Sequence, residues 1–344
     1  MTSPLPARIE VASTRTFATG LLLELIAAIR ATRPGDLVAL TGDAAVRSDL
    51  EAWCRMTGHA LVGATADGPA TRWVIRHGAA THEEQGSLPL GARVWLYTNF
   101  DCNLRCDYCC IRSSPTTPRR GIGLDRVRRI AAEAAGLHVQ EFFITGGEPF
   151  LLPDIADIVA ACAGTAPTTV LTNAMLFRGK RVAALRALPR DRVTLQVSLD
   201  SPDPALHDSH RGAGAWAAAR AGIEVARAEG FRVRLAATVS TDEEERRFAE
   251  FLDRAQVASR DRVIRRIALR GFAEQGLALS RADLVPELTI TADGVYYHPI
   301  GADDEDLLVT RDIFPLARAV DAVRRAFEKE QEHATRLASV YHCA

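Results

Sequence analysis

The sequence predicts an α/β protein in which a small two-layer α/β unit precedes a larger parallel sheet. Three observations lead to this prediction. Residues 8–78 hold a short mixed series of strand and helix patterns, residues 93–270 alternate strand with helix, and a polar, turn-rich stretch separates the two. The chain has 344 residues, 47% hydrophobic and 25% charged, which is the composition of a globular protein with one large domain or two ordinary ones.

The first unit, residues 1–80, is predicted to contain four strands and two helices. In the first helix, at 19–32, the residues Leu22, Leu25, Ile26 and Ile29 recur at the spacing of one helical face. The remaining elements are expected as strands at 8–13, 36–42, 59–68 and 71–77 and a helix at 45–58. Residues 81–92 are predicted to be a linker, because polar residues and turn formers are frequent there.

The second unit, residues 93–285, is predicted to be a series of strand-helix pairs. Strands are expected from residue 93 and at 141–145, 168–173, 192–200, 231–240 and 262–269. Helices are clearest at 214–229 and at 242–256, where Thr241 and Glu244 form a capping-box pattern. This alternation predicts a parallel sheet, open or curved into a partial barrel, with functional residues at the carboxyl ends of the strands.

Residues 286–344 are predicted to form a hairpin, a helix and a polar tail. Asp293 and Gly294 are the turn formers of the hairpin, and the helix is expected at about 313–330.

Charge and hydropathy exclude several classes of partner. The formal net charge of −1 provides no global basic field, so neither a nucleic-acid nor a membrane partner is expected. No apolar run approaches the length of a membrane span, and the run at 20–31 lacks the features of a signal peptide. We therefore expect a cytoplasmic protein whose cysteines are thiols, metal ligands or redox groups rather than disulfides.

Four of the seven cysteines lie in the stretch "DCNLRCDYCC" at 101–110, directly after the first strand of the second unit. Cys102, Cys106 and Cys109 have spacings that can wrap one small inorganic centre, either zinc or an iron-sulfur cluster. No second cysteine pair or nearby histidine follows to complete a structural zinc site. Three ligands leave one position open, which is typical of a catalytic centre, and Cys110 lies outside the ligand pattern.

This cysteine pattern, the aromatic Tyr108 and "GGEPF" at 146–150 together resemble the radical S-adenosylmethionine (SAM) superfamily. The resemblance covers about residues 93–270 and extends to "TN" at 172–173, "SLDSP" at 198–202 and "HDSHRG" at 207–212. It implies a partial (βα)6 TIM-like barrel and an enzyme whose cofactors are a [4Fe-4S] cluster and SAM.

The resemblance also implies roles for particular residues. Cys102, Cys106 and Cys109 would each ligate one iron, and the fourth iron would chelate the amino and carboxylate groups of SAM. The implied cofactor-binding residues are Tyr108, Gly146, Gly147, Glu148, Pro149, Asn173, Ser198, Asp200 and Arg211. Glycine permits close backbone approach, a carboxylate accepts charge-assisted hydrogen bonds, and a guanidinium suits a carboxylate.

In such enzymes the reduced cluster cleaves SAM, and the resulting 5'-deoxyadenosyl radical abstracts hydrogen from a substrate carbon. A low-potential ferredoxin or flavodoxin is the implied electron donor. No catalytic residue is assigned, although Cys110 and Cys343 are candidates for a role at the site. The hairpin at 288–299 resembles the start of a SPASM or twitch accessory domain. Because no cysteine lies between Cys162 and Cys343, we expect it to be degenerate and the protein to hold a single cluster.

The first unit resembles sulfur-carrier domains of the TusA or SirA type. The similarity lies in "RPGD" at 33–36, "DLEAWCRMTGHALV" at 49–62 and "TRWVIRHG" at 71–78. Those domains begin their first helix with a reactive Cys-Pro, whereas this chain has Ala18 and Thr19 at that position. A role in binding, docking or stabilisation is therefore expected in place of a persulfide relay.

The leading hypothesis is a radical SAM enzyme that abstracts hydrogen from a peptide or natural-product precursor. One alternative is sulfur-related modification of a small molecule with the help of the carrier-like unit. A second, of a different class, is a non-catalytic iron-sulfur sensor or docking protein. A zinc-binding interaction module is a further alternative.

Overall fold

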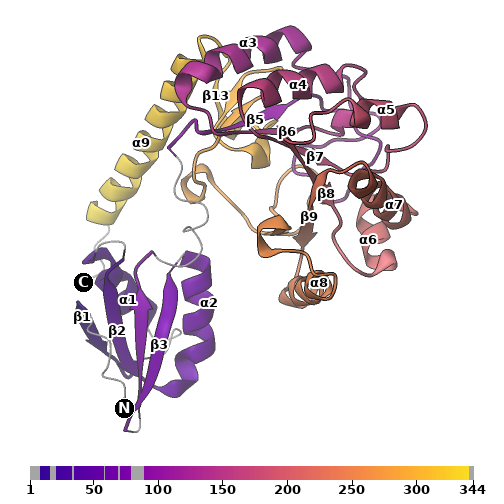
Figure 1. Ribbon diagram of the computed structural model, residues 1–344. Coiled ribbons are helices and arrows are strands. Elements are labelled where there is room, and N and C mark those ends of the chain that lie inside the picture. Colours follow the sequence, from indigo (N-terminus) through magenta and orange to yellow (C-terminus); the bar gives the residue numbers. More distant parts are fainter. Residues whose placement is uncertain are drawn as a thin grey trace. The chain divides into compact units, whose positions relative to one another are not determined.

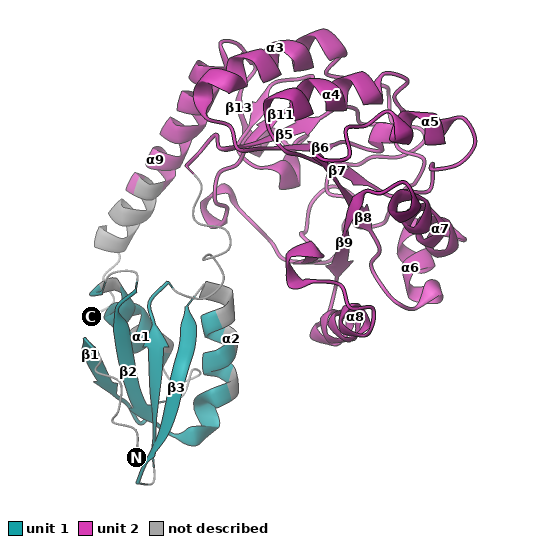
Figure 2. Ribbon diagram, viewed as in Figure 1, with its two compact units in different colours: residues 1–88 teal, residues 89–344 magenta. Residues whose placement is uncertain are grey.

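A computed structural model describes residues 8–15, 21–32, 35–57, 59–68, 70–78 and 89–340. The chain divides into two compact units, residues 1–88 and residues 89–344 (Figure 2). Each unit has its own sheet and its own hydrophobic core, as expected of separate domains.

The described part of the first unit is a four-stranded sheet with two α-helices (Figure 1). Its elements are β1 (Ile9–Ala12), α1 (Leu21–Arg30), β2 (Leu37–Gly42), α2 (Arg47–Thr57), β3 (Ala60–Asp67) and β4 (Ala70–Arg76). The strand order is β1-β2-β4-β3, with β1 parallel to β2 and the other pairs antiparallel. Leu25 and Ile29 are buried on the predicted apolar face of α1, and Ile26 packs at its border. The predicted elements are therefore confirmed, while the Leu22 side chain lies outside the described residues.

The second unit is built on parallel strands that neighbour one another in chain order. They are β5 (Arg93–Tyr97), β6 (Glu141–Thr145), β7 (Thr168–Thr172), β8 (Val193–Ser198), β9 (Arg232–Val239) and β10 (Arg262–Arg266). The helices between them are α3 (Leu124–Ala134), α4 (Ile155–Thr165), α5 (Arg181–Arg186), α6 (Pro204–Arg211), α7 (Ala215–Ala228) and α8 (Asp242–Arg254). This confirms the predicted α/β fold with a parallel sheet. In the described residues the sheet ends at β10 and β13, so it is not a closed barrel.

The C-terminal segment extends this sheet on the other side of β5. β11 (Leu288–Ile290) pairs in parallel with β5, β12 (Val295–Tyr296) pairs antiparallel with β11, and β13 (Leu308–Thr310) pairs with β12. The predicted hairpin turn is confirmed, because the Thr291 N–H donates to the Gly294 carbonyl at 2.9 Å. The parallel pairing of β11 with β5 was not foreseen. The final helix, α9 (Leu316–Val340), continues beyond the predicted end near residue 330.

The two faces of the large sheet differ in chemistry. On one face, apolar residues such as Val94, Phe142, Val170 and Leu195 are buried in the core with α3, α4 and α7; α3 and α4 lie over this face in Figure 1. Side chains alternate between faces along a strand, and paired residues of parallel strands share a face. The other face therefore carries the set Trp95, Tyr97, Phe143, Thr145, Gln196, Ser198, Arg234, Thr238 and Arg265.

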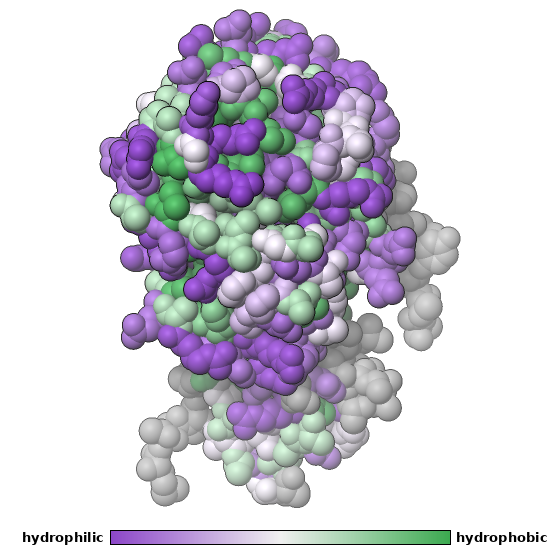
Figure 3. Space-filling model, turned by 90° about the vertical axis from the view of Figure 1, so that its right-hand side faces the viewer, coloured by the Kyte–Doolittle hydropathy of each residue, from purple (hydrophilic) through white to green (hydrophobic). Residues whose placement is uncertain are grey.

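Among the described residues, no helix has both the length and the apolar character that crossing a bilayer requires. On the face shown in Figure 3, hydrophobic patches are bordered by hydrophilic residues. The large hydrophobic side chains that are exposed in the described part are Leu269, Leu277 and Val285. All three lie between β10 and β11.

Candidate active site

The face of the large sheet that carries Tyr97, Thr238 and Arg265 is called the polar face. A cavity of about 370 Å³ lies on this face, at the carboxyl ends of the strands. Every one of the strands β5 to β10 contributes to its lining, through Trp95, Tyr97, Thr145, Leu171, Thr172, Ser198, Thr238, Arg265 and Arg266. This is the end of a parallel α/β sheet at which active sites are found.

The cysteine loop follows β5 and forms one wall of the cavity, which Cys102, Cys106, Cys109 and Cys110 all line. Backbone amides point at two of the sulfur atoms: Leu104 N lies 3.4 Å from Cys102 Sγ, and Ser113 N lies 3.4 Å from Cys109 Sγ. Hydrogen bonds of this kind stabilise negative charge on sulfur and tune metal-bound thiolates.

Burial holds the thiols of Cys102 and Cys106 in the protonated form when no metal is bound. It raises the pKa of Cys102 to about 12, with a contribution from Glu148, and it raises the pKa of Cys106 to about 11 although Arg211 opposes the shift. Since the thiolate is the ligand form, a metal centre must supply the compensating positive charge.

Among the described residues, no three His, Cys, Asp or Glu side chains are grouped as ligands of a single metal ion. Cys102, Cys106 and Cys109 nevertheless line one cavity, and backbone amides are directed at two of their sulfur atoms. This donor set fits an iron-sulfur cluster.

The two glycines after β6 pack directly against the start of the cysteine loop. A Cβ on Gly147 would lie 2.1 Å from the Asp101 carbonyl oxygen, and one on Gly146, which has a φ of +152°, would lie 2.5 Å from the Asn99 carbonyl oxygen. The Gly147 and Glu148 N–H groups donate to these same carbonyls at 3.0 and 3.1 Å. The sequence suggested that the glycines allow a ligand to approach. In the structure they allow the two motifs of the chain to approach each other.

Glu148 connects the ends of β6 and β7. Its buried carboxylate accepts hydrogen bonds from Thr172 Oγ1 at 2.8 Å, Asn173 N at 2.8 Å and Phe150 N at 3.1 Å. Burial raises the pKa of this carboxyl group, while these donors oppose the shift. A carboxylate has about four acceptor sites, so one remains for a donor in the cavity.

Asp200 organises the wall next to the cysteine loop. Its carboxylate accepts from Arg211 Nε at 2.5 Å, Arg211 Nη2 at 3.2 Å, Thr238 N at 3.1 Å and the Tyr108 hydroxyl. Burial alone would raise the pKa of Asp200, but Arg211 outweighs it and the pKa lies below its usual value. Four donors saturate the carboxylate, whereas a guanidinium has five N–H groups and Arg211 keeps three for the cavity that it lines.

The structure brings most of the predicted site residues together. Cys102, Cys106, Tyr108, Cys109, Cys110, Gly146, Gly147, Glu148, Asn173, Ser198 and Arg211 line the cavity. Pro149 and Asp200 are not among its lining residues. Asp200 instead accepts hydrogen bonds from the lining residues Tyr108 and Arg211. Pro149 begins a short 3-10 helix, Pro149–Leu151. Cys343, Ala18 and Thr19 lie outside the described residues.

Sequence reasoning missed a second group of residues that line the cavity. These include Trp95, Arg265, Glu287 and His298. Trp95 Nε1 donates to the Glu287 carboxylate across a large separation in sequence. The one available signal was the run of arginines in "RVIRRIAL", where residues two apart share a strand face.

Comparison with known proteins agrees with this geometry. Residues 96–255 match the model of the Radical SAM superfamily. The matched stretch begins on β5, includes the three cysteines and "GGEP", and reaches the residue after α8. The chain contains a radical SAM domain. Its α/β fold with a parallel sheet agrees with the partial barrel of that domain.

Relatives that match part of this chain include a heme synthase and a bacteriocin biosynthesis protein. The AdoMet-dependent heme synthase of Methanosarcina barkeri is 33% identical over 141 residues, which are 40% of each chain. The antilisterial bacteriocin subtilosin biosynthesis protein AlbA of Bacillus subtilis is 31% identical over 161 residues, 46% of this chain and 36% of AlbA. The matched stretches thus span less than half of each relative. Among solved structures, anSMEcpe with bound AdoMet and Kp18Cys peptide superposes with a TM-score of 0.54 at 11% identity, over 68% of this chain and 82% of that one. This likeness shows a shared fold.

Proposed function

We propose that this protein is a radical SAM enzyme with one [4Fe-4S] cluster, held by Cys102, Cys106 and Cys109, and with SAM bound in the adjoining cavity. The observation that carries the proposal is that the three thiols and the residues of the "GGEP" motif line one cavity at the carboxyl ends of the strands. When bound, the reduced cluster and SAM supply a 5'-deoxyadenosyl radical that abstracts hydrogen from a substrate carbon. A low-potential ferredoxin or flavodoxin is the proposed source of the electron.

The chain's own residues would bind and orient SAM. The free acceptor position of Glu148 suits the methionine amino group, and the three uncommitted N–H groups of Arg211 suit its carboxylate or the ribose hydroxyls. Asp200 holds both Arg211 and Tyr108 in place. Ser198 and Asn173 add polar groups on the same wall.

We propose a peptide or natural-product precursor as the substrate. The support is the relationship to AlbA, which its name assigns to subtilosin biosynthesis. A small-molecule substrate is the alternative, because one relative is a heme synthase. Similarity within one domain does not transfer a substrate. Cys110 lines the cavity beside the cluster loop and is the candidate for a role in handling the substrate radical.

We propose that the first unit is a TusA-like module that binds or docks the substrate. Its support is the order strand-helix-strand-helix-strand-strand on a mixed sheet, together with the sequence similarity described above. Cys54 is buried in α2, so it does not favour a persulfide relay through this unit.

The test is reductive SAM cleavage by protein reconstituted anaerobically with iron and sulfide. We expect about four irons per chain, and 5'-deoxyadenosine, measured by mass spectrometry, after addition of dithionite and SAM. Cys106→Ala should lose cleavage. Cys162→Ala, which removes a thiol buried in the core of α4, should keep it. A wild-type rate in the Cys106 variant, or protein that binds no four-iron cluster, would refute the proposal.

The substrate class is tested by fractionating an extract of the source cells into small molecules and macromolecules. Stimulation of 5'-deoxyadenosine formation by the macromolecular fraction, with loss of the effect after proteolysis, supports a peptide. Stimulation by the small-molecule fraction alone would contradict that part of the proposal.

A further inference from the structure

Arg265 lies on the polar face of β10 and lines the cavity, where it interacts with Cys110 of the cysteine loop. It pairs in register with Thr238 of β9, and both residues line the cavity. The next residue, Arg266, has its guanidinium bound by Asp242 and Glu245 of α8. The two neighbouring arginines therefore differ, because α8 supplies carboxylates to Arg266 and none to Arg265.

Arg265 has no protein partner among the described residues. No carboxylate lies within 4.0 Å of its guanidinium, and no hydrogen bond from it is formed. Its side chain is open to solvent inside the cavity yet surrounded by protein atoms. Burial holds the pKa of Arg265 below its usual value, and Arg234 adds to the shift, while Cys110, Tyr97 and Glu287 oppose it. An arginine remains charged in proteins, so this wall carries a positive charge that no carboxylate pairs with directly.

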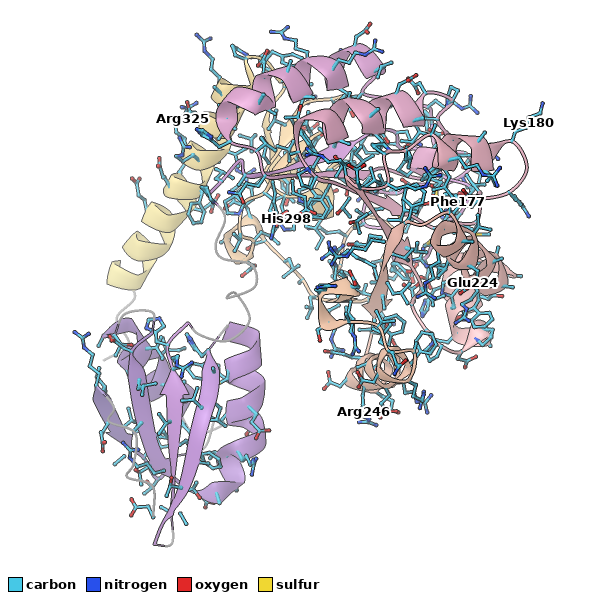
Figure 4. All side chains as sticks on the ribbon, in the orientation of Figure 1. Phe177, Lys180, Glu224, Arg246, His298 and Arg325 are labelled. Atoms are coloured by element: carbon cyan, nitrogen blue, oxygen red, sulfur yellow. The ribbon has the colours of Figure 1, made fainter. Side chains whose placement is uncertain are left out.

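His298 provides a second donor on the same wall. Figure 4 shows it on the side of the sheet away from α3 and α4. Its Nδ1 accepts a hydrogen bond from Ile300 N at 3.1 Å, so in the neutral ring the proton resides on Nε2. Burial, together with Arg265 and Arg270, lowers the pKa of His298 to about 4. At neutral pH the ring therefore presents a single uncharged N–H donor at the cavity.

Several charged residues share this face of the sheet with Arg265. Arg93 lies 3.8 Å from Glu287, and Glu141 accepts a hydrogen bond from Thr169. Arg234 adds a further positive charge, and its Nε is buried without a partner. The Glu287 carboxylate contacts Arg93 and Trp95 and forms no ion pair with Arg265. A ligand carboxylate would pair with Arg265, because its two oxygens match a guanidinium and an imidazole N–H.

We propose that Arg265, assisted by His298, binds a carboxylate group of the substrate and fixes its position in the cavity. This inference rests on the proposed function, in which the substrate occupies this cavity. In a peptide substrate the carboxylate belongs to an aspartate, a glutamate or the C-terminus.

The experiment compares a charged probe with its neutral analogue. N-acetylglycine, N-acetylglycinamide and inorganic phosphate are titrated by calorimetry into the full-length chain, before and after reconstitution. The variants are Arg265→Gln and Arg265→Lys. Arg260→Gln is the charge-matched control, because Arg260 is 76% exposed and does not line the cavity. SAM is titrated into the same reconstituted proteins.

We expect N-acetylglycine to bind the wild type and the Arg260 variant equally. It should bind Arg265→Gln at least about tenfold more weakly, as loss of a charged hydrogen-bonded pair predicts. The lysine variant should be intermediate, the amide should not bind, and SAM affinity should not change.

Several results would overturn the proposal. These are equal binding by wild type and Arg265→Gln, no saturable binding of N-acetylglycine by the wild type, or phosphate binding tighter than N-acetylglycine. A loss of SAM affinity in Arg265→Gln would assign the arginine to the cofactor instead. Because the probe is also titrated before reconstitution, failure of the cluster chemistry leaves the Arg265 result readable.

Discussion

The ion pair between Asp200 and Arg211 is expected to be the costliest single interaction to break in the cavity wall. Their side chains are only 3% and 10% exposed, and two hydrogen bonds of 2.5 and 3.2 Å join them. Replacing Asp200 by Asn removes the charge that compensates a buried guanidinium. Loss of one partner of a buried pair costs about 3 to 5 kcal/mol, so we expect Asp200→Asn to lower the free energy of unfolding by about 3 kcal/mol.

The magnitude is tested with a double-mutant cycle. Urea unfolding is measured for Asp200→Asn, Arg211→Gln and the double variant, and the coupling energy is compared with that of Arg232 and Asp261. That second pair has a similar distance, 2.6 Å, but Arg232 is 49% exposed. Its coupling should lie between about 0.2 and 1 kcal/mol. If the Asp200–Arg211 coupling is no larger than this, burial does not govern the strength of the pair and the reasoning is refuted.

Two further predictions concern the same wall. Gly147→Ala places a Cβ against the rigid Asp101 carbonyl, so we expect a loss of about 2 kcal/mol or more in urea unfolding and less iron bound per chain. Gly164→Ala, which meets open space in α4, should change stability by less than about 1 kcal/mol, and equal effects would contradict the packing argument. Burial lowers the pKa of His207 from 6.5 to about 4 in the folded protein. The unfolded chain therefore takes up the proton at a higher pH than the folded protein, and the free energy of unfolding falls as the pH drops from 6.5 to about 4. Between pH 7.5 and 5 the free energy of unfolding should fall by about 2 kcal/mol. His207→Asn keeps an acceptor for the Asp200 amide, so this variant should lose that pH dependence when urea midpoints are measured at the two pH values. An unchanged pH dependence in the variant would be evidence against the role of His207.

Local pattern was enough to locate the elements and the cluster loop. β6 was predicted at its observed bounds, and the cysteines and the "GGEP" motif were correctly expected after the first two strands of the large unit. Strand alternation, helical spacing and turn formers act over a few residues, so they can be read from the chain directly. The carboxyl ends of parallel strands meet at one edge, which is why motifs far apart in sequence could be expected at one site.

The partners of the polar residues depended on long-range register. Asp200 was expected to bind a cofactor, and in the structure its four acceptor contacts are with Tyr108, Arg211 and Thr238. Arg265 and Arg266 are adjacent and chemically identical, yet only Arg266 meets carboxylates, because the strand turns successive side chains to opposite faces. Which arginine is left without a paired carboxylate depends on what lies across each face. That is a property of packed elements and not of neighbouring residues.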